Sequence, residues 1–400
     1  MAGLHASIDA LKRHAQTLLD ADVERYSTGR TSTSSRKFLS TIITSGTLQD
    51  KVSALTLAIQ ESPVHNIKAF LSLLSLASKR SRTQAAGALG ALVDLLGPGT
   101  LLPSDRRLRA FSAQPALIAT LQKSAQRWKE GDKLPQGLTD TDLVYWLYED
   151  WLKDTFFKIV MLFENWTTDD VEFARIKGLD FVYGLLKEKP EQEANLLRLL
   201  VDKLGDREKR VCSRASYLLL QLQVSHPGMK SIIVDTVDKE LLLDPARGTR
   251  AQYCAINTLN QTILSSKEPE LVKRLLDIYF QLFALLLEDQ KIGADADADT
   301  DANQDAGNQQ ARRGSPKDRS ARPSSKASTK GKGKPVPAPQ DGPAAETVDK
   351  LVSAILTGIN RAVPFASVAD SGLVGDVFFF CLYNMLHRAL LTLYQTTSPC

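Results

Sequence analysis

The sequence predicts an all-α fold, in which pairs of antiparallel helices stack into a solenoid. Two observations support this prediction. Residues 187–230 contain two apolar stripes at helical spacing, separated by a short charged turn. In addition, a small residue recurs at Gly178, Ala215 and Ala255, which are 37 and 40 residues apart. A period of about 40 residues is typical of stacked helix pairs, each of which buries its apolar face against its neighbours.

The segment 187–230 has the features of one complete helix pair. Its two apolar stripes are Leu197, Leu200 and Leu204, then Val211, Ala215, Leu218, Leu219 and Leu222. Pro190 suits a helix start, because its missing N–H would be unpaired there, and Gly205 and Asp206 separate the helices. The second helix resembles that of a HEAT repeat; the alternative is a plain helical hairpin. We therefore expect an α-solenoid of HEAT/armadillo-like repeats.

The N-terminal third is expected to contain a loose segment, more repeats and a connector. Residues 1–35 are polar toward their end and predict a loosely ordered segment, in which residues 1–20 are able to form one amphipathic helix. Residues 36–96 contain successive helices with short polar breaks and predict further repeats. Residues 97–138, with several Gly and Pro, predict a connector. In it, Trp128 is expected to be either a packed indole or a base-stacking platform.

Residues 139–291 are predicted to form the main HEAT-like solenoid. Its first helix begins near Thr139 or Thr141, either of which is able to cap it, and Asp140 and Asp142 favour the positive end of its dipole. The aromatic residues of this helix cover more than one face. We expect them to form either a core or a partner groove: Tyr145, Trp146, Tyr148, Trp151, Phe156, Phe157 and Phe163.

Residues 292–346 are predicted to form a disordered, low-complexity, charged linker. Residues 293–335 contain no large apolar residue and no cysteine, so burial cannot offset their ordering entropy. Five Asp residues come first and a basic block follows. We interpret that block as a tether for nuclear import or RNA phosphates, and the alternative is a solvated linker. Its cations are Arg312, Arg313, Lys317, Arg319, Arg322, Lys326, Lys330, Lys332 and Lys334.

The C-terminal part is expected to comprise one more helix and a divergent segment. Residues 347–366 return to a helical pattern, and residues 367–400 are unlike the rest. The stretch 373–394 is apolar, but Asp376 and Arg388 interrupt it, and too few uninterrupted residues remain for the roughly 20 that a membrane span requires.

Composition and motifs provide no evidence for catalysis. The net charge of +4 does not by itself predict nucleic-acid binding. The isolated cysteines, at positions 212, 254, 381 and 400, predict reduced thiols, and the N-terminus has no secretory signal. None of the five histidines has metal-ligand spacing, and no phosphate loop or nucleophile motif occurs. We expect no enzyme activity, no cofactor and no metal.

Several long blocks occur in the order and spacing of one family. They are KFLSTIITSGTLQDKVSALTLAIQESPVHNIKAFLSLL, KRSRTQAAGALGALVDLL, LLPSDRRLRAF, the helix pair at 187–230, RAQYCAINTLNQTILSSKEPELVKRLLDIYFQLF and LTGINRAVPFA. The chain thereby resembles the CCAAT-binding-factor family, which includes nucleolar complex proteins of the Mak type. The family has a charged extension before these blocks and a helical region after them. We therefore expect a C-terminally truncated or divergent member.

The resemblance implies a non-enzymatic scaffold that acts in the nucleus and nucleolus. Its implied partners are nucleolar complex assembly factors and pre-60S particles, with pre-rRNA as a further candidate and with no membrane or small-molecule substrate. Two alternatives stay open, a CCAAT-promoter-associated transcription regulator and a HEAT-type transport adaptor. The candidate contacts are the charges of one repeat turn, although Arg214 has an alternative structural role as a partner of Asp206: Lys203, Arg207, Lys209, Arg210 and Arg214.

Overall fold

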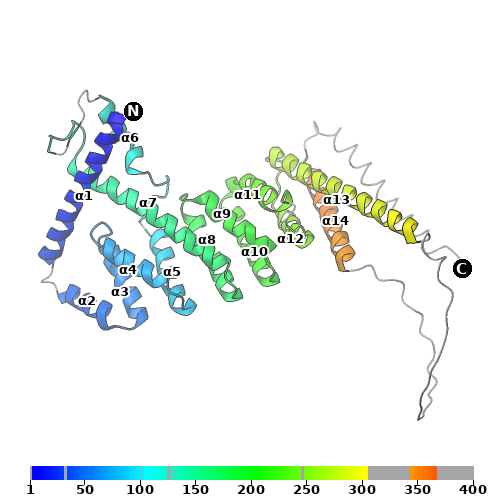
Figure 1. Cartoon of the computed structure of the whole chain (residues 1–400), viewed down its shortest axis with the longest axis horizontal. Helices are drawn as coiled ribbons and strands as arrows, with labels where there is room; N and C mark the ends of the chain where they lie inside the picture. Colours follow the sequence, from blue (N-terminus) through cyan, green and yellow to red (C-terminus); the bar gives the residue numbers. More distant parts are fainter. Residues whose placement is uncertain are drawn as a thin grey trace, which may run out of the picture. The chain divides into compact units, whose positions relative to one another are not determined.

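The structure is a computed structural model that describes residues 2–30, 34–99, 101–123, 128–129, 131–244, 247–304 and 343–366. Within these ranges the regular elements are α-helices and short 3-10 or π turns, and none is a strand (Figure 1). The predicted all-α class is confirmed. The chain divides into two compact units, Met1–Asp244 and Pro245–Cys400, and each is described by itself.

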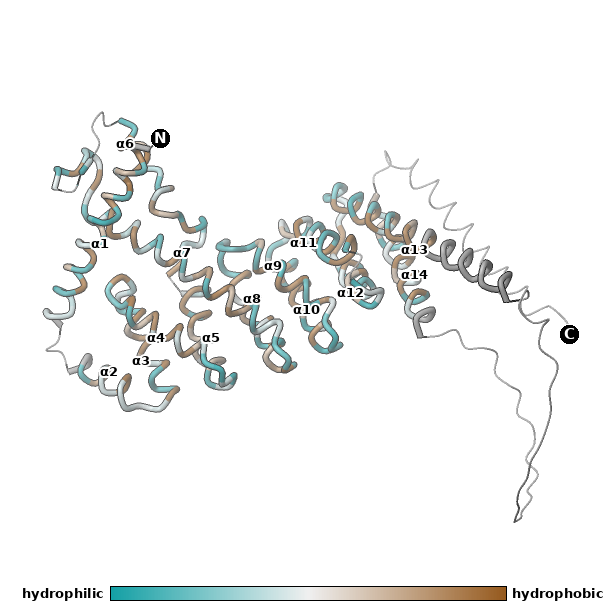
Figure 2. Tube along the Cα trace, in the orientation of Figure 1, coloured by the Kyte–Doolittle hydropathy of each residue, from teal (hydrophilic) through white to brown (hydrophobic). Residues whose placement is uncertain are grey.

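The first unit is a stack of helix pairs. The pairs are α2 (Ser34–Ser45) with α3 (Leu48–Glu61), α4 (Ile67–Ala77) with α5 (Arg82–Leu96), α7 (Asp140–Thr167) with α8 (Glu172–Glu188), and α9 (Glu193–Asp202) with α10 (Lys209–Ser225). The second helices α3, α5, α8 and α10 contact one another in that order, and α11 (Lys230–Val237) packs against α9. Figure 2 shows apolar and polar residues mixed along each helix, as expected for helices buried on one side. The predicted helical repeat is confirmed.

The connector does not interrupt this stack, because α5 packs directly against α8. It contains η1 (Phe111–Ala113) and α6 (Pro115–Lys123), and η1 packs on α7. The N–H of Phe111 donates to Asp150 Oδ1 at 3.0 Å. Trp128 is buried in the same region, with its ring centroid 5.6 Å from that of His14. The packed-indole interpretation of Trp128 is confirmed, and the base-stacking interpretation is wrong.

The N-terminal segment contains the helix that was expected to be possible over residues 1–20, but the helix is longer and the segment less loose than expected. Residues Ala2–Arg30 form one helix, α1, which packs against α7. Its buried apolar residues recur at three- and four-residue steps: Ile8, Leu11, Ala15 and Leu19. Lys12 Nζ lies 2.5 Å from Asp150 Oδ2. The stripe is short and the sequence around it is polar, so only the complementary face of α7 explains why the segment is ordered.

The long helix α7 connects the connector region to the repeats. It begins with the expected cap, in which Asp142 N–H donates to Thr139 Oγ1 at 3.2 Å and Thr139 N–H donates to Asp142 Oδ2 at 3.1 Å. Phe156 and Phe163 are fully buried, which confirms core packing for these rings. Tyr145 and Phe157, however, are 61% and 48% exposed. The aromatic residues of α7 therefore serve the core and also reach the surface.

The second unit consists of α12 (Thr249–Leu259), α13 (Pro269–Gln304) and α14 (Pro343–Ala362), and α14 packs against both of the others. Asn260 joins the three helices: Tyr279 Oη donates to its Oδ1 at 2.8 Å, and its Nδ2 donates to the carbonyl of Ala354 at 2.8 Å. Gly358 lies against this junction, and a Cβ there would fall 2.6 Å from Tyr279 Cζ. The chain therefore needs glycine at this position for α14 to approach α13.

The helix α13 continues through Gln304, beyond residue 292, where the disordered linker was expected to begin. Extending an existing helix adds one hydrogen bond for each residue ordered, and the alternating alanines of this stretch have the highest helix propensity. The remainder of the linker, residues 305–342, and the segment 367–400 lie outside the described residues.

Candidate partner-binding surface

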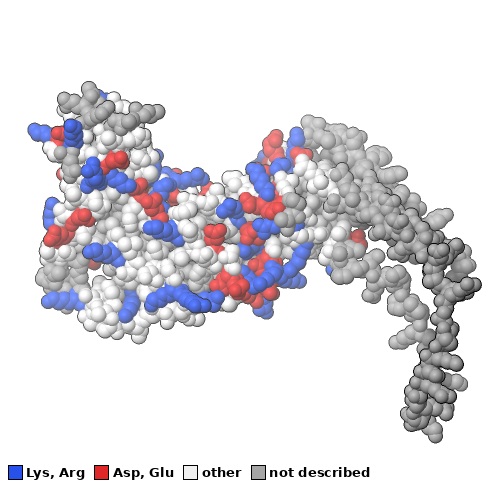
Figure 3. All heavy atoms as spheres, viewed as in Figure 1, with Lys and Arg blue, Asp and Glu red and all other residues white. Residues whose placement is uncertain are grey.

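The turns inside the helix pairs lie along one edge of the first unit. These turns precede α5, α8 and α10, and the three helices are successive neighbours in the stack. We call the segments 78–82, 168–172 and 203–210 the turn edge. Along the lower margin of Figure 3, Lys and Arg side chains gather near α5 and α10, with Asp and Glu between them. The edge is therefore strongly charged but mixed in sign.

Hydrogen bonds and ion pairs join each turn to the next. Arg82 Nε lies 3.0 Å from both carboxylate oxygens of Asp169, and Arg207 Nη2 donates to the carbonyl of Asp170 at 3.0 Å. Burial alone would raise the pKa of Asp169, but the hydrogen bonds from Arg82 and from the N–H of Val171 hold it below its ordinary value. Several charged side chains at this edge therefore hold successive repeats together.

Two of the five predicted contact residues are tied into the fold. Lys203, in η2 (Lys203–Gly205), is only 8% exposed and lies 2.9 Å from Asp202 Oδ2, so it is not an exposed charge as expected. Arg214 does have a structural partner, but the expected partner, Asp206, is wrong. Its Nη2 lies 2.8 Å from Asp180 Oδ1 on the preceding repeat. Asp206 is instead occupied by Arg175.

The other three predicted residues are exposed at the start of α10. The side chains of Arg207 and Arg210 are 64% and 84% exposed. Arg210 lies 3.8 Å from Glu172, a loose contact. Lys209 is exposed and has no ion pair among the described residues. Lys209 and Arg210 are therefore the least constrained of the predicted contacts, whereas Arg207 is exposed but also donates to the carbonyl of Asp170.

The sequence reasoning missed two further cations, Lys79 and Arg80. Both are exposed in the turn before α5, and neither has a carboxylate partner in the part of the chain that the structure describes. The basic run KRSR at 79–82 was the signal that would have identified them. The candidate site therefore comprises five residues, the turn-edge cations: Lys79, Arg80, Arg207, Lys209 and Arg210.

The predicted basic tether at 312–334 lies outside the described residues, and its role stays a prediction. Cys212 is buried and Cys254 is partly buried, whereas Cys381 and Cys400 lie outside the description. No described helix has the length and apolar character needed to cross a membrane. Among the described residues, His, Cys, Asp and Glu nowhere gather in threes that would hold a metal ion.

His65 is explained by local structure. Its ring stacks on Tyr26 of α1, with centroids 4.2 Å apart, and Nε2 lies 2.9 Å from Asp22 Oδ2. Its Nδ1 lies 2.6 Å from Ser62 Oγ, three residues earlier in the chain. This histidine therefore joins α1 to the break between α3 and α4.

Several proteins of known name are similar to the chain, although no established protein-family model matches it. It is 53% identical to "Ribosome biogenesis protein NOC1" of Chaetomium thermophilum over 369 residues, which are 92% of the chain. It is 32% identical to "Protein SLOW WALKER 2" of Arabidopsis thaliana over 86% of its length. It is 27% identical to human "CCAAT/enhancer-binding protein zeta" over 98% of its length.

The chain spans about a third of the length of these relatives: 33%, 29% and 32%, respectively. Because the alignment with the human protein covers 98% of the 400 residues of the chain, it extends into the segment 367–400. The similarity therefore covers both units of the structure as well as part of the segment that was expected to be divergent.

Proposed function

The chain belongs to the CCAAT-binding-factor family, and from that premise we propose that it is a non-enzymatic scaffold for nucleolar assembly of the large ribosomal subunit. The observation that carries the proposal is the 53% identity, over 92% of the chain, to a protein named for ribosome biogenesis. The proposed partners are nucleolar assembly factors and pre-60S particles. The proposed location is accordingly the nucleolus.

The turn-edge cations are the proposed contact with pre-rRNA. Arg207 and Lys209 project from a turn that is fastened to its neighbour by the buried Arg175, so their backbone is held in place before a partner binds. A preorganised contact loses less conformational entropy on binding. Lys79 and Arg80 extend the same edge two helices away, because α5 and α10 both contact α8. An extended row of cations suits a phosphate backbone.

The test is a charge reversal at cations that lack carboxylate partners, Lys79→Glu, Arg80→Glu and Lys209→Glu combined. In cells expressing the tagged variant, we expect loss of most co-purified large-subunit precursor RNA. With purified protein and precursor RNA, affinity falls as salt rises, and the plot of log affinity against log salt should become shallower in the variant. Its slope should fall in magnitude by about three, since each lost phosphate contact removes about one unit of slope.

The matched control is Lys158→Glu, on an exposed residue of α7 outside the turn edge. It should leave both measurements close to those of the unchanged chain. If the triple variant still associates with precursor RNA to the same extent, the turn edge is not the contact. If the tagged chain does not enter nucleoli, the proposed function itself is wrong.

A second candidate is transcription, favoured by the name of the mouse and human relatives, "CCAAT/enhancer-binding protein zeta". In that case the tagged chain would occupy CCAAT-containing promoters in chromatin and would bring down little precursor RNA. A transport adaptor would instead give a diffuse cytosolic signal. The same tagged chain therefore distinguishes the three functions.

A further inference from the structure

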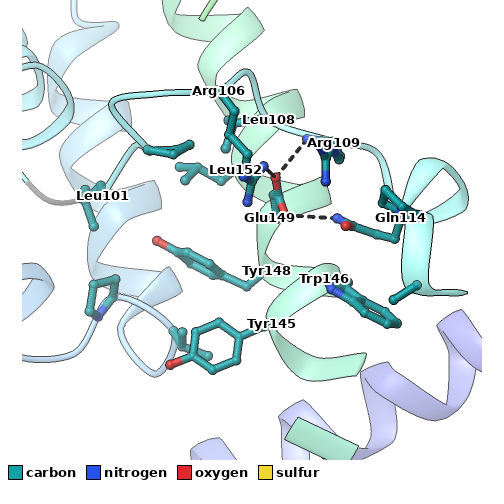
Figure 4. Close-up of a pocket in the computed structure, with 15 residues that line it drawn as sticks. Leu101, Arg106, Leu108, Arg109, Gln114, Tyr145, Trp146, Tyr148, Glu149 and Leu152 are labelled. Carbon is teal, nitrogen blue, oxygen red and sulfur yellow. Dashed lines mark hydrogen bonds and ion pairs between the residues drawn. The ribbon is translucent and has the colours of Figure 1, made fainter. Parts of the chain in front are cut away.

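A pocket of about 610 Å³ opens in the first unit beside the N-terminal half of α7 (Figure 4). The connector forms one wall, and Pro63 and Val64, from the break between α3 and α4, form another. The walls are mainly apolar or aromatic, with Leu101, Tyr145, Trp146, Tyr148 and Leu152 among them. Pockets of this size and character are typical binding sites for a small ligand or for one or two large side chains.

The acidic residue of the pocket is fully engaged. Arg106 forms an ion pair with Glu149 Oε1, the N–H of Arg109 donates to the same oxygen at 2.9 Å, and Gln114 Nε2 donates to Oε2 at 2.9 Å. Figure 4 shows these contacts converging on one carboxylate. Glu149 therefore holds the connector against α7, and its carboxylate needs nothing further from an occupant.

One cation in the pocket, by contrast, lacks a carboxylate partner among the described residues. The guanidinium of Arg109 is exposed, and no described carboxylate pairs with it, because Glu149 is bonded to its backbone N–H instead. An occupant that supplies a carboxylate would therefore pair with Arg109.

We propose that this pocket binds a short acidic peptide segment of a partner protein, through one large apolar side chain and an adjacent carboxylate. The apolar side chain lies against Tyr145 and Trp146. The carboxylate pairs with Arg109. The site is separate from the turn edge, so the inference does not depend on RNA binding there.

The lining favours a peptide over RNA. The pocket offers one unpaired cation, whereas RNA-binding grooves follow the backbone with several. Its other arginine, Arg106, is neutralised by Glu149. The walls are mainly apolar and aromatic, with a single unpaired charge. In a peptide complex of this kind, the buried apolar side chain of the peptide provides affinity, and the charge pair with the protein provides specificity.

The test uses the purified full chain and a phage-displayed library of random 12-residue peptides, selected in parallel on a double variant, Tyr145→Ala with Arg109→Glu. We expect enriched sequences with an aromatic or large aliphatic residue next to Asp or Glu. A synthetic peptide of the enriched sequence should lose at least tenfold in affinity on Arg109→Glu, which reverses the charge that pairs with its carboxylate.

The control is Lys158→Glu, the same charge change on an exposed residue of α7 that does not line the pocket, and it should leave the peptide affinity unchanged. Circular dichroism should show that Arg109→Glu retains the fold, since the replaced side chain is exposed. Equal selection on the unchanged chain and the double variant would overturn the proposal, as would enriched peptides without acidic residues. Displacement of the peptide by a 12-nucleotide RNA, with RNA binding lost in Arg109→Glu, would assign the pocket to RNA instead.

Discussion

Arg175 of α8 and Asp206 of the α9–α10 turn form an ion pair across two successive repeats, with Nε 3.0 Å from Oδ2 and side chains only 4% and 6% exposed. The N–H of Nε is not aimed at the carboxylate, so the contact is an ion pair without hydrogen-bond geometry. Nη1 of the same arginine donates to the carbonyls of Asp169 and Asp170, at 2.8 and 3.0 Å. One buried guanidinium therefore fastens two turns of the proposed contact surface.

Replacing this arginine alone should strongly destabilise the first unit. Arg175→Met leaves the Asp206 carboxylate buried without a counter-charge, and we expect a loss of about 3–5 kcal/mol in the free energy of unfolding. Urea unfolding followed by circular dichroism measures it. The double variant with Asp206→Leu should recover much of the loss, because no buried charge then remains unpaired. An equal loss in the single and double variants would contradict this account.

The acid stability of the chain should depend on Glu149. Burial works to raise its pKa, but the hydrogen bonds from Arg106, Arg109 N–H and Gln114 outweigh burial and lower it. Its ionised form therefore stabilises the fold above the unfolded pKa of about 4.3, and that contribution is lost as pH falls through the lower folded pKa. Glu149→Gln should cost about 1–3 kcal/mol at pH 7.

The difference between Glu149→Gln and the unchanged chain should shrink as the pH falls from 5 to 3. Thermal unfolding at several pH values checks this, and the exposed Glu164 provides the control substitution, Glu164→Gln. Melting curves that shift in parallel across the whole range would show that the pKa of Glu149 is not lowered by folding.

The packing of α1 gives a third prediction. Leu11 is fully buried against the α7 region, so Leu11→Ala should cost about 2–5 kcal/mol through lost burial and the cavity left behind. The exposed Gln16 of the same helix provides the control, and Gln16→Ala should change the unfolding free energy by less than about 0.5 kcal/mol. Equal stability of the two variants would restore the expectation of a loose N-terminal segment.

Two glycine substitutions should have opposite signs. A Cβ at Gly358 would lie 2.4 Å from Asn260 Oδ1 and 2.6 Å from Tyr279 Cζ, so Gly358→Ala should destabilise the second unit by about 1–3 kcal/mol. Gly87, on the exposed side of α5, meets nothing closer than 3.6 Å, and Gly87→Ala should stabilise its helix by about 0.5–1 kcal/mol. Hydrogen exchange resolved by segment measures both effects, and faster exchange in α12–α14 for Gly358→Ala is the expected signature.

Local patterns were sufficient to predict the repeats. Helical spacing identified Leu197, Leu200 and Leu218 as core residues, and all three are buried in the structure. A cap at Thr139 or Thr141 was also predicted, and Thr139 forms it, because a cap depends only on residues about three positions apart. Features within one or two helical turns are readable from sequence for this reason.

The partners of individual charges were not readable in this way. Lys203 and Lys209 lie six positions apart in one basic turn, yet Lys203 is buried and Lys209 is exposed. Arg214 was expected to meet Asp206, eight positions away, but it binds Asp180, 34 positions away, because its partner is on the preceding repeat.

The sequence by itself therefore determined that this protein is a stack of amphipathic helix pairs, because periodicity and capping act over a few residues. The tertiary structure alone decided which charges are free to bind, that the N-terminal segment is a packed helix, and that a pocket opens beside α7. Each of these depends on contacts between residues far apart in the chain, and such contacts exist only once the helices have packed.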